Sequence, residues 1–256
     1  MGTAPNINAW KQTTLTPFHT EMIAHMRGVV GAGPLLLFNN TGVEAVGLSP
    51  TLHLRPEGEG LMYAPHMYDG GLIGGEPYLG HEPEVHMASI AEFARAEGVA
   101  ALIGEFGYHL ESADEGATWL TRLMDALDAE RVSGTLWEYS RNEELWNEED
   151  LSVVDAAGTP RPIVDVYVRP WLRAVAGSAP SFRWDAALGE GVARWTGDGG
   201  VSELVLPARV FPGGISGLSL ETVEGPPGAC HFHDEARGEV RVRVPAGAQV
   251  ELRFAR

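Results

Sequence analysis

Short apolar runs alternate with amphipathic segments over the first two thirds of the chain. Four runs predict strands at 34–38, 60–69, 99–103 and 132–139. Apolar residues at helical spacing predict helices over 16–30, 83–97 and 159–177. A further helix is predicted to begin at the capping box from Ser112 to Glu115. Residues 1–14 are polar and read as irregular. This alternation predicts βα units on a parallel sheet.

The pattern changes after Gly177. Short segments with period-two alternation take over, as in Val240, Val242 and Val244, and Gly and Pro turns separate them. Residues 178–256 therefore predict a second, antiparallel β-domain of about eighty residues.

Composition narrows the possible partners. A net charge of −17 argues against a partner that is bound through a basic surface, such as nucleic acid. The single Cys230 excludes an internal disulfide. The first thirty residues carry no secretory signal pattern, and no run approaches the length of a membrane span.

Candidate chemistry lies where the predicted strands end. Glu105 stands in Gly104-Glu-Phe-Gly107 directly after an apolar run, and the flanking glycines would let other groups approach its carboxylate closely. The C-terminal ends of strands carry the active sites of (β/α) barrels. His66 with Tyr68, and Trp137 with Tyr139, follow two other strands. A carboxylate nucleophile needs hydrogen-bond donors and a sugar ring suits an indole face, so this combination favours a carbohydrate site.

Other chemistries find weaker support. His81 and His86 with Glu82 and Glu84, or His231 with His233, could ligate zinc, but no HExxH spacing is present and solvated histidines explain them better. No Gly-x-Ser-x-Gly elbow indicates a serine triad. The reaction that the strand ends suggest needs no cofactor.

The sequence resembles the retaining glycoside hydrolases of family five, most closely the endoglycoceramidase-like branch. The matching segments begin at Tyr63, Ile103, Gly134, Trp146 and Arg169, and read YAPHMYD, IGEFG, GTLWEY, WNEEDLS and RPWLRAVAG. The resemblance extends from about Thr16 to the C-terminus. It implies a TIM-barrel glycosidase that acts on a β-glycosidic bond of a glycosphingolipid or related glycolipid, outside the cell.

The resemblance also assigns roles to residues. Glu105 would be the nucleophile, Tyr68 would hydrogen-bond it and His66 would brace the subsite. Trp137 would form the floor beneath the sugar ring, and Trp146 would line the cleft.

One part of the retaining machinery is missing from the sequence pattern. Retention needs a second carboxyl group about 5 to 5.5 Å from the nucleophile, which the family carries on an Asn-Glu pair after its fourth strand. Only four strand–helix units precede Gly177, whereas an eightfold barrel takes about 250 residues. Asn142-Glu143 and Asn147-Glu148 are poor replacements, and Glu138 is out of phase with Trp137.

We therefore expect residues 1–177 to form the C-terminal half of a (β/α)8 barrel, strands five to eight, and residues 178–256 to form a β-sandwich. The chain would be a fragment, or one half of a barrel that a second chain or self-association completes. A non-catalytic fragment that binds carbohydrate or glycolipid is the alternative.

Overall fold

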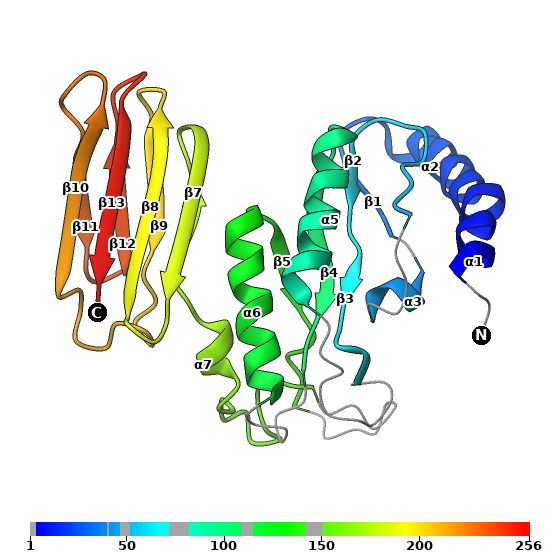
Figure 1. Cartoon of the computed structure of the whole chain (residues 1–256), viewed down its shortest axis with the longest axis horizontal. Coiled ribbons are helices and arrows are strands. Elements are labelled where there is room, and N and C mark those ends of the chain that lie inside the picture. The colour runs from blue at the N-terminus through cyan, green and yellow to red at the C-terminus, as the bar shows by residue number, and fades with distance from the viewer. Residues whose placement is uncertain (1–3, 40, 47–51, 72–81, 109–114, 142–150) are drawn as a thin grey trace. The chain divides into compact units, whose positions relative to one another are not determined.

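The computed structural model describes residues 4–39, 41–46, 52–71, 82–108, 115–141 and 151–256 (Figure 1). The chain divides into two compact units, Met1–Arg161 and Pro162–Arg256. The second unit begins before the boundary that we predicted after Gly177, because strand β6 (Trp171–Ala174) belongs to one of its sheets.

A parallel sheet forms the centre of the first unit. Its strands are β1 (Leu36–Phe38), β2 (Leu61–Tyr63), β3 (His66–Met67), β4 (Ala100–Phe106) and β5 (Ser133–Leu136). β2 and β3 pair with successive parts of β4, so they act as one strand interrupted at Ala64 and Pro65. The spatial order therefore follows the chain order, and all pairs are parallel, as predicted.

Helices precede and connect these strands. They are α1 (Ala4–Trp10), α2 (Thr16–Val30), α3 (Gly42–Ala45), α5 (Pro83–Ala96) and α6 (Glu115–Glu130). None of the helices in the described ranges is long and apolar enough to cross a membrane.

The prediction that residues 1–14 are irregular is wrong. A π-helical turn (η1, Lys11–Leu15) joins α1 to α2 without a break. Lys11 is buried there, and its ammonium donates to the Glu44 carboxylate and to the Leu52 carbonyl. A polar sequence is thus held in a helix by contacts far along the chain.

Helices α5 and α6 contribute fully buried apolar side chains to the first unit. Ile90, Leu120 and Leu123 are fully buried, as is Ile103 of β4. Tyr63 of β2 lies with its ring centroid 5.0 Å from that of Phe93 in α5. The core of this unit therefore lies on the face of the sheet that these helices cover.

The second unit consists of two antiparallel sheets of four strands. One has the order β10 (Gly217–Glu224), β13 (Gln249–Ala255), β8 (Glu190–Gly197) and β7 (Gly177–Asp185); the other has β11 (Cys230–Asp234), β12 (Glu239–Arg243), β9 (Val201–Val205) and β6. Side chains from both sheets form one core, which includes Trp184, Trp195, Val240 and Leu252. The antiparallel β-structure predicted from the period-two pattern is confirmed.

The helix predicted over 159–177 is wrong. Only α7 (Val164–Tyr167) is helical there. Pro170 has no amide hydrogen to continue a helix, and Trp171 and Leu172 pair with Val205 and Leu204 of β9. Pairing with the sheet therefore overrides the helical spacing of the apolar residues.

Candidate active site

Glu105 lies near the C-terminal end of β4 with its carboxylate contacted from the neighbouring strand. The parallel register pairs His66 of β3 directly with Glu105. The Tyr68 hydroxyl donates a hydrogen bond to Oε1 of Glu105, and Nδ1 of His66 lies 3.7 Å from Oε2. The sequence predicted these three residues at neighbouring strand ends, and the structure brings them into one cluster.

The Glu105 carboxylate lies on the face of the sheet that α5 and α6 leave uncovered. A side chain at Gly134 would contact both Phe106 and Leu127 of α6, so Phe106 lies on the helix-covered face. The β4–β5 pairing is irregular between Ile103 and Phe106, but the β3–β4 pairing is regular there: Met67 opposite Phe106 is buried, and His66 opposite Glu105 is partly exposed. Glu105 therefore points to the face opposite that of Phe106. Its side chain is 27% exposed and that of His66 is 38% exposed, so a substrate can reach both.

Two glycines allow the strands to approach closely around Glu105. A Cβ on Gly104 would stand 2.8 Å from the Ala64 carbonyl oxygen, and one on Gly107 would stand 2.2 Å from the Trp137 carbonyl oxygen. Both separations are shorter than nonbonded contacts permit. The two glycines thus allow neighbouring backbone segments to approach each other closely, whereas from the sequence we expected them to admit other groups to the Glu105 carboxylate.

Thr135 makes a contact beside Glu105 that the sequence did not reveal. Its hydroxyl donates to the Gly104 carbonyl oxygen at 2.5 Å, which links β5 to the residue before Glu105. Its position on a strand, two residues before Trp137, was the only sequence signal that it lies near the site. Its bond to Gly104 depends on the register between β4 and β5, which the sequence does not specify.

Trp137 lies at the same end of the sheet as Glu105. Its amide donates to the Phe106 carbonyl at 2.8 Å, and the Trp137–Glu138 peptide bond is cis. The Glu138 backbone pairs with the segment that follows, donating to the Leu151 carbonyl at 3.4 Å and accepting from the Val153 amide at 2.9 Å. Tyr139 is largely exposed.

Several predicted candidates cannot be placed. Trp146, Asn142-Glu143, Asn147-Glu148 and His81 lie outside the described residues. Among the residues that are described, no group of three or more His, Cys, Asp or Glu side chains could hold a metal ion. His231 and His233 lie on β11, opposite Val242 and Val240.

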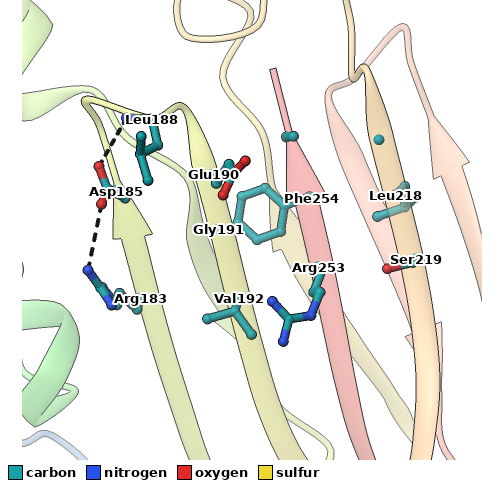
Figure 2. A pocket seen from close by; sticks show the side chains of 12 residues that line it. Arg183, Asp185, Leu188, Glu190, Gly191, Val192, Leu218, Ser219, Arg253 and Phe254 are labelled. Carbon is teal, nitrogen blue, oxygen red and sulfur yellow. Dashed lines mark hydrogen bonds and ion pairs between the residues drawn. The ribbon is translucent and has the colours of Figure 1, made fainter.

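A groove of about 610 Å³ lies on the second unit, over strands β7, β8, β13 and β10 (Figure 2). Val192 lies between two arginines on neighbouring strands, Arg183 and Arg253. Arg183 is 3.6 Å from Asp185, and Arg253 is 2.5 Å from Glu251. None of the candidate site residues predicted at the strand ends lines this groove. Its two arginines form ion pairs with neighbouring carboxylates.

Comparison with known families identifies the first unit. Residues 3–143, more than half of the chain, match the family described as cellulase (glycosyl hydrolase family 5). The chain belongs to glycoside hydrolase family 5. The matched residues include His66, Tyr68, Glu105 and Trp137. No curated protein matches the chain at a significant level.

Solved structures show the same fold over nearly all of this family-five chain. Endo-glycoceramidase II from Rhodococcus sp., in complex with a five-membered iminocyclitol, is 20% identical with a TM-score of 0.68, covering 96% of this chain and 56% of that chain. Its lactosyl-enzyme intermediate gives 20% identity, a TM-score of 0.67, and coverage of 96% and 55%. Sterylglucosidase 1 from Cryptococcus neoformans is 15% identical with a TM-score of 0.57, and the match covers 77% of this chain and 38% of that chain. The chain thus spans about half the length of the endo-glycoceramidase.

Proposed function

We propose that this chain supplies the nucleophile half of a retaining β-glycosidase active site. Glu105 attacks the anomeric carbon while the bond to the aglycone oxygen breaks and an acid/base carboxyl group protonates that oxygen. Water, deprotonated by the same acid/base, then releases the sugar from Glu105. The single observation that carries the proposal is the Tyr68 hydroxyl donating to the Glu105 carboxylate on the uncovered face of the sheet, in a chain of family 5.

The Tyr68 hydroxyl has a defined chemical role in this proposal. The hydroxyl donates to Oε1 of the nucleophile. Two contacts from one neighbouring strand also fix the direction of the carboxylate, and orientation is a large part of catalysis. His66, 3.7 Å from the other oxygen, lies where it can contact a sugar hydroxyl next to the reacting carbon.

We also propose that the acid/base comes from outside the described residues. The partners seen around Glu105 are a hydroxyl and an imidazole, whereas retention needs a second carboxyl group about 5 to 5.5 Å away. Four consecutive parallel strands in chain order, with helices on one face, suit the second half of a (β/α)8 barrel. The two four-stranded sheets around one core suit a β-sandwich behind it.

A glycolipid is the proposed substrate class. The structural neighbours named endo-glycoceramidase and sterylglucosidase are, by their names, enzymes of glycosylated ceramide and sterol. One of the endo-glycoceramidase structures holds a lactosyl-enzyme intermediate, which supports covalent chemistry in this fold. Glycosphingolipids would place the working protein outside the cell.

Covalent labelling tests the proposal directly. We would incubate the chain with a 2-fluoro-β-glycoside that carries a good leaving group and measure the intact mass, with a fluorogenic β-glucoside assayed in parallel. Each protein would be tested alone and with a separately expressed first half of a family-five barrel. We expect one sugar to be added at Glu105 in the mixture and no addition to Glu105→Gln.

Glu138→Gln is the matched control, since Glu138 is a half-buried carboxylate at the end of the next strand. It should label like the unchanged protein. Labelling that survives Glu105→Gln, or that disappears in Glu138→Gln alone, would show that the nucleophile is misassigned. Sugar binding without labelling or turnover in any combination would favour the non-catalytic alternative.

A further inference from the structure

Two arginines on neighbouring strands of the second unit are held by one buried carboxylate. Glu251 of β13 is 9% exposed, and its two oxygens lie 2.5 Å from Nε of Arg194 and Nε of Arg253. The side chains of these arginines are 58% and 62% exposed. Within the described part of the chain, no protein acceptor is bonded to the terminal nitrogens of either guanidinium. Each arginine is therefore fixed through Nε, while its terminal N–H donors are available to a ligand.

One of these arginines belongs to a row of side chains that crosses the groove of Figure 2. The register places Arg183, Val192, Arg253 and Ser219 side by side on β7, β8, β13 and β10. A terminal nitrogen of Arg183 lies 3.6 Å from Asp185, which is longer than a hydrogen bond. Two strand spacings, about 10 Å, separate the backbones of the two arginines. Both long side chains can therefore reach one phosphate group above Val192, which guanidinium donors suit well.

The adjacent row of the groove is acidic. Asp185 lies directly opposite Glu190 across the β7–β8 hairpin. Like charges in this arrangement are unfavourable, so the row favours a cationic ligand group beside it. Two residues along a strand, about 7 Å, separate this row from the arginine row. These two acids and two arginines, Arg183 and Arg253, are the charged residues that line the groove, so its charges balance.

An apolar tip stands at the end of the groove. Residues 186–189 join β7 to β8, and Leu188 in this turn is 69% exposed. The Asp185 carboxylate accepts from the amides of Ala187 and Leu188 at 3.1 and 3.0 Å, so a groove residue also fixes the turn that presents the leucine (Figure 2). An apolar side chain next to phosphate-binding groups suits a bilayer interface, where the apolar group enters the acyl boundary and the polar groups stay among the headgroups.

Charge indicates which kind of bilayer fits. The chain carries a net charge of −17, which opposes binding to a surface of anionic lipids. Phosphocholine and phosphoethanolamine headgroups carry one phosphate and one ammonium group and have no net charge. They match the arginine row and the acidic row together, whereas a simple anion would match the arginines and leave the acidic row without a partner.

We propose that the groove of the second unit binds the headgroup of a zwitterionic phospholipid at a bilayer surface. Arg183 and Arg253 bind the phosphate. Asp185 and Glu190 lie beside the ammonium group, and Leu188 enters the acyl boundary. The inference does not rest on the proposed function, because lipid binding requires no turnover and none of the candidate active-site residues.

The test measures partition of the whole chain onto vesicles of palmitoyl-oleoyl phosphatidylcholine by flotation. Exposed apolar side chains on α2 offer a second way to adsorb, so matched variants decide. We expect Arg253→Gln and Leu188→Ser each to weaken partition at least tenfold, the scale of a lost charge-assisted hydrogen bond or of a leucine left in water. The controls lie on the other sheet: Arg241 is also exposed and paired with carboxylates, and Phe232 is 63% exposed. Arg241→Gln and Phe232→Ser should leave partition unchanged.

Spin-labelled lipid provides a second readout that does not depend on variants. With a doxyl group near the top of the acyl chain, the methyl signals of Leu188 should broaden more than those of Val201, an exposed valine on β9. The fluorescence of Trp184 and Trp195, both buried in the core of the second unit, would establish that each variant keeps that core.

Several results would overturn the proposal. These are equal losses in the groove and control variants, no preferential broadening of Leu188, and partition onto phosphate-free digalactosyl-diacylglycerol vesicles or onto phosphatidylglycerol vesicles that matches or exceeds partition onto phosphatidylcholine. Shifts of the Arg253 Nε signal on titration with soluble phosphocholine, without partition onto vesicles, would assign the groove to a free phosphate ester and overturn the lipid surface. Glu105→Gln should partition like the unchanged chain, so lost labelling with retained partition would leave this inference standing whatever becomes of the proposed function.

Discussion

Gly107→Ala tests whether the close approach of β4 and β5 holds the active-site end of the sheet. The new Cβ would lie 2.2 Å from the Trp137 carbonyl oxygen and 3.3 Å from its carbonyl carbon. Both are backbone atoms, so no side-chain rotation relieves the contact. The strand ends must separate, which strains the 2.8 Å bond from the Trp137 amide to the Phe106 carbonyl.

The magnitude follows from these contacts. Overpacking a tight site costs about 1–3 kcal/mol, and loss of one backbone hydrogen bond adds about 1 kcal/mol. Replacing Gly by Ala returns about 0.5 kcal/mol by restricting the unfolded chain. We therefore expect the first unit to lose about 1.5–3.5 kcal/mol of unfolding free energy.

Urea unfolding followed by circular dichroism at 222 nm is the assay, because all described helices except α7 lie in the first unit. Two matched glycines serve as controls, since a Cβ on Gly33 or Gly98 meets no atom within 4 Å. Gly33→Ala should be nearly neutral, and Gly98→Ala should lose about 1 kcal/mol because its φ is +64°. A Gly107→Ala protein as stable as Gly33→Ala would refute the steric reasoning.

Two further predictions concern the Glu105 cluster and His53, a partly buried histidine before β2. Tyr68→Phe removes a donor to a carboxylate, a bond worth about 1.5–3 kcal/mol, so labelling of the assembled site should slow about 10- to 100-fold with an unchanged dichroism spectrum; an unchanged rate would remove Tyr68 from the mechanism. Burial, followed by the nearby His86 and Lys11 charges, lowers the pKa of His53 from 6.5 to about 4. A lowered folded-state pKa gives stability that is complete above pH 6.5 and is lost as the pH falls through 4. With allowance for solvent screening at this partly exposed ring, urea unfolding should show that the unfolding free energy falls by about 1–2 kcal/mol between pH 6.5 and pH 4. His53→Gln should reduce this fall. Equal pH profiles of stability for the two proteins would contradict the assignment to His53.

The sequence predicted the parallel strands well because each carries a local signature. The run from Val99 to Ile103 is apolar and ends in glycine, and both properties act within a few residues. The strand ends also predicted which side chains would gather, since parallel strands end at one edge. Register could not be predicted, and register decides that His66 lies opposite Glu105 and that Thr135 reaches Gly104.

The two errors in the helices share a cause. Residues 1–14 read as irregular because no apolar face is present, yet the buried contact of Lys11 with Glu44 holds a helix there. Ile163, Val166 and Tyr167 have helical spacing, yet β9 recruits Trp171 into a sheet. In both places a partner distant in sequence outweighs local preference, and single-sequence patterns contain no information about that partner.

Because the strands follow one another in the sheet in chain order, sequence changes can alter separate parts of the site independently. His66 and Tyr68, Glu105, and Trp137 each belong to a different βα unit, on neighbouring strands of one sheet. A change in the loop after one strand can therefore alter one wall of the site while the strand that carries the nucleophile is left untouched. Descendants of such a scaffold can acquire new sugar or lipid preferences one loop at a time and keep the same reaction.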